Sequence, residues 1–164
     1  MKKLLLAGAA AAMMTGVAGW AQEDDDDAPA AAAPAAFGAR TLEIGAAGLM
    51  ERSNRTDLDP IQLTAGAMKS AGAYKLLSGG YYRIRIASDG TQEQAIEGPG
   101  LFRNVWVNEV VINDLEVRPL GLDSVEFDDE GEVELSFVAI TPGTYDLRIR
   151  GTSGDTQKAT FTIE

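Results

Sequence analysis

Residues 133–164 read VELSFVAITPGTYDLRIRGTSGDTQKATFTIE, and this C-terminal stretch decides the fold class. Apolar and polar side chains alternate over residues 133–137, which is typical of a strand with one face in a hydrophobic core. Pro142 and Gly143 interrupt the alternation, and we expect a type II turn there, with a positive φ at Gly143. A second alternating strand follows. One of its faces carries Tyr145, Leu147 and Ile149, and the other carries Asp146, Arg148 and Arg150.

Similar short alternating runs occupy much of the preceding chain. Asn113-Asp114 and the segment Asp128 to Gly131 have the composition of hairpin turns, and Asp89-Gly90 is a strong turn signal. Residues 68–77 are the one segment for which we expect a short helix. The expected strands lie within residues 39–46, 59–66, 81–88, 101–107, 109–117 and 123–140, in addition to the two late strands.

Strand number and turn spacing predict the architecture. About seven or eight strands, with a turn every 8–12 residues, indicate an antiparallel Greek-key β-sandwich over residues 37–164. Immunoglobulin-like and prealbumin-like topologies remain alternatives at this point.

The N-terminal 36 residues differ in composition from the rest. Residues 1–21 combine Lys2 and Lys3, a short apolar run and a small-residue exit, as a secretory signal peptide does. An uncleaved membrane anchor is the alternative, but the apolar run is short for one. Residues 22–36 join an acidic block to an Ala/Pro tract, a composition that favours a disordered linker. We expect an exported bacterial protein, periplasmic or secreted, with no integral membrane segment in its mature chain.

Composition excludes several classes of chemistry. The 164 residues include no His and no Cys, so no imidazole base, thiolate nucleophile or disulfide can form. The formal net charge is −11, and removal of Lys2 and Lys3 would make it −13. A chain with this net charge repels nucleic acid, because the phosphate backbone is also negatively charged and is bound mainly by basic side chains. We therefore expect no nucleic-acid partner, no cofactor and no metal, but a protein partner in the periplasm.

Residues 76–151 resemble a cupredoxin-like domain. The segments SGGYYRIRIAS, residues 78–88, and VELSFVAITPGTYDLRIRG, residues 133–151, carry the resemblance, which covers about half of the chain. In copper-binding members of that family, the strand after Gly-Thr-Tyr carries a thiolate ligand four residues beyond the tyrosine. That position is Ile149 here. Because type-1 copper also needs two imidazoles, the resemblance implies a member without the copper ligands.

Four arginines form the most suggestive charged feature. Arg83 and Arg85 share one face of a predicted strand, and Arg148 and Arg150 share one face of another. Guanidinium groups bind carboxylate or phosphate in a bidentate manner, so these residues are candidates for binding a small anion. Cross-strand pairing with acidic neighbours on the same sheet face is the structural alternative.

Trp106 is the candidate anchor for a protein partner. If Val105 and Val107 face the core, Trp106 points outward and suits an interface; the alternation also allows the opposite orientation. A run of carboxylates is the only pattern that suggests catalysis, since glycoside hydrolysis uses two such groups across a cleft. A solvated strand edge is the other interpretation of that run. Its members are Asp123, Glu126, Asp128, Asp129, Glu130, Glu132 and Glu134.

The sequence therefore favours a non-catalytic, exported module that acts by protein–protein contact, with no catalytic residue. Binding of a small anion at an arginine-lined sheet face is the first alternative. A carboxylate-based hydrolase is the second.

Overall fold

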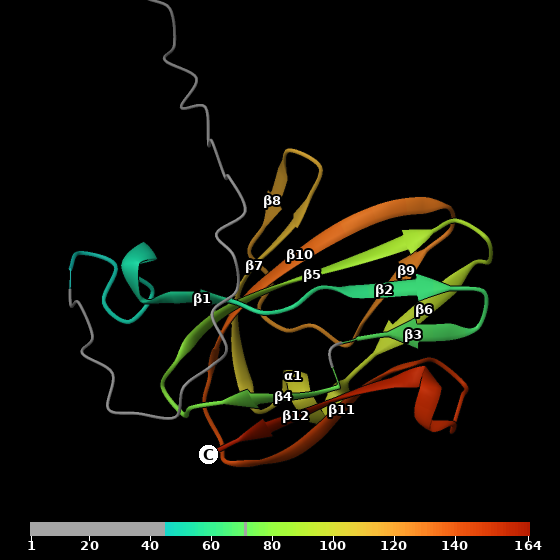
Figure 1. Cartoon of the computed structure of the whole chain (residues 1–164). Helices are drawn as coiled ribbons and strands as arrows, with labels where there is room; N and C mark the ends of the chain where they lie inside the picture. Colours follow the sequence, from blue (N-terminus) through green and yellow to red (C-terminus); the bar gives the residue numbers. More distant parts are fainter. Residues whose placement is uncertain (1–44, 71) are drawn as a thin grey trace, which may run out of the picture.

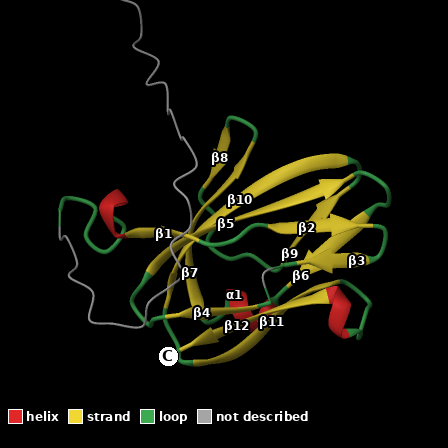
Figure 2. Cartoon of the chain, in the orientation of Figure 1, coloured by secondary structure: helices red, strands yellow, loops and turns green. Residues whose placement is uncertain are grey.

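Two packed β-sheets form the protein in a computed structural model that describes residues 45–70 and 72–164 (Figure 1). The expected signal peptide, the linker and most of the expected strand at residues 39–46 lie outside these residues. Strands dominate the described part of the chain (Figure 2). The β-sandwich class predicted from the sequence is confirmed.

The larger sheet has seven strands in the order β3-β2-β5-β10-β7-β8, with β1 beside β5. β5 and β10 are long and form its centre, where all nine residues of β5 have partners on β10. The seven strands are β1 (Arg55–Asp57), β2 (Ile61–Thr64), β3 (Ala67–Lys69), β5 (Tyr81–Asp89), β7 (Val105–Ile112), β8 (Leu115–Val117) and β10 (Glu130–Ala139).

The smaller sheet has five strands in the order β4-β12-β11-β6-β9. Three short helical segments accompany the sheets: α1 (Pro99–Phe102) and the 3-10 turns η1 (Arg52–Asn54) and η2 (Asp155–Gln157). The five strands are β4 (Ala73–Leu76), β6 (Gln94–Glu97), β9 (Ser124–Phe127), β11 (Gly143–Ile149) and β12 (Lys158–Ile163).

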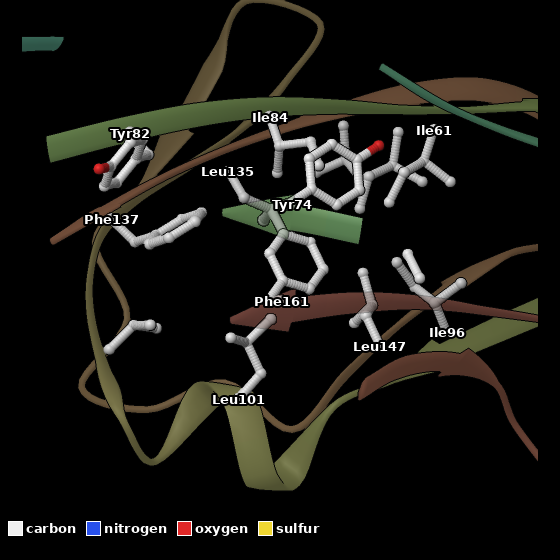
Figure 3. Close-up of a cluster of buried hydrophobic side chains, with 14 of the residues drawn as sticks. Ile61, Tyr74, Tyr82, Ile84, Ile96, Leu101, Leu135, Phe137, Leu147 and Phe161 are labelled. Atoms are coloured by element: carbon white, nitrogen blue, oxygen red, sulfur yellow. The ribbon is translucent and has the colours of Figure 1, made fainter. Parts of the chain in front are cut away.

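The hydrophobic core fills the space between the sheets (Figure 3). Tyr74 and Phe161 stack at its centre, with ring centroids 4.7 Å apart and planes 15° apart. β5 and β10 contribute alternate residues from the larger sheet, as the period-2 pattern predicts. The buried residues of these two strands on that face include Tyr82, Ile84, Ile86, Val133, Leu135 and Phe137.

Two sequence predictions are wrong for related reasons. Residues 68–77 form β3 and β4 instead of a helix, and Gly72, with φ of 97°, lies in the link that carries the chain from one sheet to the other. The expected hairpin around Asp128 to Gly131 is also absent, because β9 pairs with β6 while β10 pairs with β5 and β7. The same turn residues suit a hairpin and a corner between sheets, so local composition cannot distinguish them.

The hairpin expected at Asn113-Asp114 is confirmed: it joins β7 to β8, and Asn113 has φ of 52°. Strand pairing is not purely antiparallel, however. β1 and β2 both run parallel to β5, and β4 runs parallel to β12. Both sheets are therefore mixed.

Gly143 has the expected positive φ, but its value of 154° differs from the roughly 80° of a type II turn. Glycine is needed there for another reason. A Cβ atom at this position would lie 2.6 Å from the hydroxyl of Tyr145, whose single O–H is shared between the carbonyls of Thr141 and Pro142 at 3.0 and 3.2 Å. Gly80 and Tyr82 repeat this arrangement in the other sheet, with the Tyr82 hydroxyl accepting a bond from a backbone N–H. Each tyrosine hydroxyl thus forms a hydrogen bond with the backbone of the turn that precedes its own strand.

Candidate functional site

Ile149, which the sequence resemblance matches to a thiolate ligand, is buried at the end of β11. It lies opposite Ile96 of β6, and both side chains belong to the hydrophobic core. An aliphatic side chain has no ligand atom, and the chain has no His or Cys to replace it. These residues do not fit a type-1 copper ion.

Arg83 lies on the outer face of the larger sheet, where its guanidinium joins three strands. Its Nε and Nη2 atoms donate to the Asp57 carboxylate of β1 at 2.9 and 2.6 Å. Nη1 lies 3.2 Å from Glu134 of β10. The side chain of Arg83 is only 8% exposed, so a charged group is buried here together with its partners. Arg85 lies opposite Glu134 in the strand register and forms an ion pair with it at 3.1 Å.

Arg148 and Arg150 belong to the smaller sheet and its margin, so they do not join Arg83 and Arg85 in one stripe. Arg148 contacts Asp146 at 3.3 Å and donates to the carbonyl of Thr152 at 2.9 Å. Arg150 reaches β6 and β9, where it pairs with Glu97 at 3.1 Å and donates to Ser124 at 2.7 Å. All four arginines therefore have carboxylate partners within the chain; those of Arg83, Arg85 and Arg150 lie on other strands, as the cross-strand alternative expects, whereas Asp146 lies on the same strand as Arg148.

A polar network that the sequence did not indicate continues across the outer face of the larger sheet. Asn108 of β7 donates to the hydroxyls of Tyr81 and Ser136 at 3.3 and 3.4 Å. Arg118 follows β8 and pairs with Glu109 at 3.0 Å. Tyr81 and Ser136 are both buried, although they alternate with core residues. Period-2 alternation assigns such residues to solvent, so only the tertiary contacts identify the network.

Trp106 points outward from β7, which settles the two orientations that the sequence left open. Its side chain is 61% exposed, while Val105 on the other face is buried. Trp106 lies opposite Val138 of β10, and Ile140, which directly follows the end of β10, is 50% exposed. We call Trp106 and Ile140 the Trp106 patch.

A second set of exposed apolar side chains lies on the hairpin of β7 and β8, which extends away from the body of the sandwich (Figure 1). Ile112 and Leu115 are opposite each other in the register, and Val117 lies two residues beyond Leu115 on the same face. All three are exposed. The hairpin is therefore an apolar ribbon at the edge of the larger sheet.

Most of the carboxylates considered for catalysis are exposed, and Glu134 is half-buried. Glu126 and Asp128 come together with Glu93, and ligand atoms of the three lie within 4.8 Å of one another. All three residues are exposed. Glu134 is instead occupied by Arg83 and Arg85. The arrangement resembles a solvated strand edge more than a hydrolytic pair, which requires a sugar-binding cleft.

Solved structures similar to this one come from copper oxidases. A blue copper oxidase from Nitrosomonas europaea superposes with a TM-score of 0.52 at 13% sequence identity, over 68% of this chain and 45% of that chain. A multicopper oxidase from Pseudomonas thermotolerans gives 0.51 at 15% identity, over 70% of this chain and 31% of that chain. The fold is cupredoxin-like.

The likeness extends to the fold alone. This chain spans less than half of the length of either copper oxidase. No known family model matches the sequence, and no curated protein matches it significantly. Among the described residues of the cupredoxin-like domain, no helix combines the length and the apolar character that crossing a membrane would require.

Proposed function

We propose that this chain is an exported module of the bacterial periplasm, a cupredoxin-like domain without copper that catalyses no reaction and acts by protein–protein contact. The exposure of Trp106 carries the proposal. Tryptophan is enriched at the centres of protein interfaces because its large ring buries much apolar area and its indole N–H can form a hydrogen bond. Here 61% of the residue is exposed on the outer face of a sheet, beside the exposed Ile140.

The donor set supports the metal-free part of the proposal. Ile149 occupies the position of the thiolate ligand, and the chain contains no imidazole. The basic start and apolar run of residues 1–21 support export. An exported chain without Cys is consistent with a bacterial periplasm, where disulfides are common but not required.

Ion binding at the arginines and hydrolysis by the carboxylates have less support. Each of the four arginines already contacts a carboxylate of the chain, and an incoming anion would have to displace it. The cluster of Glu93, Glu126 and Asp128 is exposed, so water would screen any catalytic charge there.

Site-specific photo-crosslinking in the periplasm of the native host tests the proposal. A photoreactive phenylalanine analogue at position 106 should form one discrete adduct, which mass spectrometry can identify. The same analogue at Thr144, an exposed position on the smaller sheet, is the matched control and should form none. Equal adduct patterns from positions 106 and 144, or no adduct from 106, would contradict a contact role for the Trp106 patch.

Metal content tests the other half of the proposal. Protein purified from the periplasm should contain no stoichiometric copper when measured by plasma mass spectrometry. One copper per chain would overturn the metal-free assignment, irrespective of the crosslinking result.

A further inference from the structure

A cleft of about 510 Å³ opens between the edges of the two sheets, and none of its lining residues belongs to the Trp106 patch. One wall is β3 with Ser70, Gly72 and Ala73, and the other is η2 with the start of β12. These elements lie beside each other at the right of Figure 1, where β3 passes above the helical turn η2. The volume is within the range of pockets that bind small molecules.

The side chain of Gln157 joins the two walls of the cleft by hydrogen bonds. Gln157 of η2 donates from its amide nitrogen to the carbonyl of Gly66, in the β2–β3 turn, at 3.0 Å. The oxygen of the same amide accepts from the N–H of Gly154 at 3.2 Å. Both ends of the Gln157 amide are therefore engaged, so the walls are tied together before any ligand enters. Preorganisation of this kind lowers the entropic cost of binding.

Two lysines line the cleft, and they differ in whether an acidic side chain lies near the ammonium group. Lys158 of β12 lies 3.4 Å from Asp146 and 3.6 Å from Asp155. Lys69 of β3 is exposed, and the part of the chain that the structure describes places no acidic partner beside it. Among residues 45–70 and 72–164, Lys69 and Arg103 are the basic side chains for which the structure records no partner. A cleft-lining lysine without a recorded acidic partner among these residues is unexpected in a protein with a net charge of −11.

Part of the lining of the cleft is apolar. Ala67, Met68 and Ala73 contribute to its lining, and Met68 also belongs to the hydrophobic core. The flexible thioether of a methionine adapts to apolar groups of different shapes. The lining of the cleft thus combines these apolar residues with Lys69 and Lys158.

We propose that this cleft binds a small carboxylate that carries a short alkyl tail. The carboxylate contacts the ammonium group of Lys69, and the tail lies against Ala67, Met68 and Ala73, while Lys158 keeps its contacts with Asp146 and Asp155. Asp155 is the opposing charge: its side chain is 96% exposed at the rim and repels an anion. This inference is independent of the protein-contact role of Trp106, because the two sites share no residue.

A titration followed by amide NMR chemical shifts tests the proposal, with hexanoate as the probe and acetate and inorganic phosphate for comparison. Hexanoate should cause saturable shifts at residues 67–69 and 155–160 and should bind more tightly than either comparison ion. Lys69→Gln should weaken hexanoate binding by about fivefold, the upper range for one solvent-exposed ion pair. Arg103→Gln is the matched control, since it removes the other unpartnered cation and should leave binding unchanged.

Asp155→Asn provides a change of opposite sign. It should strengthen hexanoate binding by about two- to threefold, because it removes a repulsive charge from the rim. No saturable shift with hexanoate, or equal affinities for Lys69→Gln and Arg103→Gln, would overturn the proposal. Phosphate binding as tightly as hexanoate would overturn the assignment of an alkyl-tailed ligand. Circular dichroism establishes that each variant is folded.

Discussion

Arg83 and Arg150 show how far one residue type can differ in energetic role within a single protein. Arg83 is 8% exposed and lies between the carboxylates of Asp57 and Glu134. Arg150 is 48% exposed and contacts Glu97 at the molecular surface. Water screens the second pair strongly and the first pair little. Loss of Arg83 would leave Asp57 with Arg55, and Glu134 with Arg85, as partners.

We therefore expect Arg83→Ala to lower the free energy of unfolding by about 3 kcal/mol, because it removes one partner of a buried ion pair. Arg150→Ala should lower it by less than about 1 kcal/mol. Urea denaturation followed by circular dichroism measures both values. Similar losses in the two variants would show that the outer face of the sheet near Arg83 is more hydrated than its burial indicates.

The β2–β3 hairpin is the element whose position depends most visibly on long-range side-chain bonds. Gln94 of β6 donates to the carbonyl of Thr64 at 2.8 Å, and Gln157 of η2 donates to that of Gly66 at 3.0 Å. Both bonds join the smaller sheet and its margin to one turn of the larger sheet. Gln94 is buried, and its Oε1 atom has no hydrogen-bond partner among the described residues. The hairpin is thus fixed at its tip by two amides.

Gln157→Ala should loosen this hairpin without unfolding the sandwich. We expect a loss of about 1 kcal/mol, typical of one net hydrogen bond, and faster hydrogen exchange at the amides of residues 63–68. Gln62→Ala, at an exposed position of β2, is the control and should leave that exchange unchanged. Faster exchange spread evenly over both sheets would mean that Gln157 stabilises the whole domain instead of the hairpin.

For the whole molecule, acidity determines how stability depends on pH. Because the formal net charge is −11, protonation of carboxylates near the pI of about 4.4 reduces the repulsion between negative charges. The same protonation removes the charge of carboxylates that form ion pairs and hydrogen bonds in the folded state. Asp146 is such a carboxylate. Partial burial raises the pKa of Asp146, but the hydrogen bond from Thr160, the nearby Lys158 and the bond from Arg148 together lower it below its ordinary value.

A group whose pKa is lower in the folded state stabilises the protein above its unfolded pKa, which is about 4 for aspartate. This contribution disappears as the pH falls through the folded pKa. We expect Asp146→Asn to reduce the free energy of unfolding by about 1 kcal/mol at neutral pH and by progressively less below about pH 4. Urea titrations of both proteins across this range measure the difference.

Glu132→Gln removes the same charge from an exposed position of β10 and separates the local effect from the effect of net charge. A pH-independent loss in Asp146→Asn, or the same pH profile in both variants, would contradict the assignment of this dependence to Asp146.

The opposite outcomes at Asn113-Asp114 and at Asp128 to Gly131 mark the limit of local prediction. Both have turn composition between alternating runs, and the first is a hairpin. At the second, the chain changes sheets, because β9 completes the edge of the smaller sheet beside β6. Which strand pairs with β9 depends on packing between residues that are about thirty positions apart in the chain, and turn chemistry does not encode it.

By itself, the sequence determined the β-sandwich class, the exclusion of imidazole and thiolate chemistry, and the strand faces of residues such as Ile84 and Leu135. These follow from composition and from the two-residue period of a strand, which are local properties. The tertiary structure alone decided that Trp106 is exposed, that Arg83 is buried and paired, and that Lys69 and Lys158 line one cleft. Burial and proximity of this kind arise from contacts between distant segments, and a period of two cannot specify them.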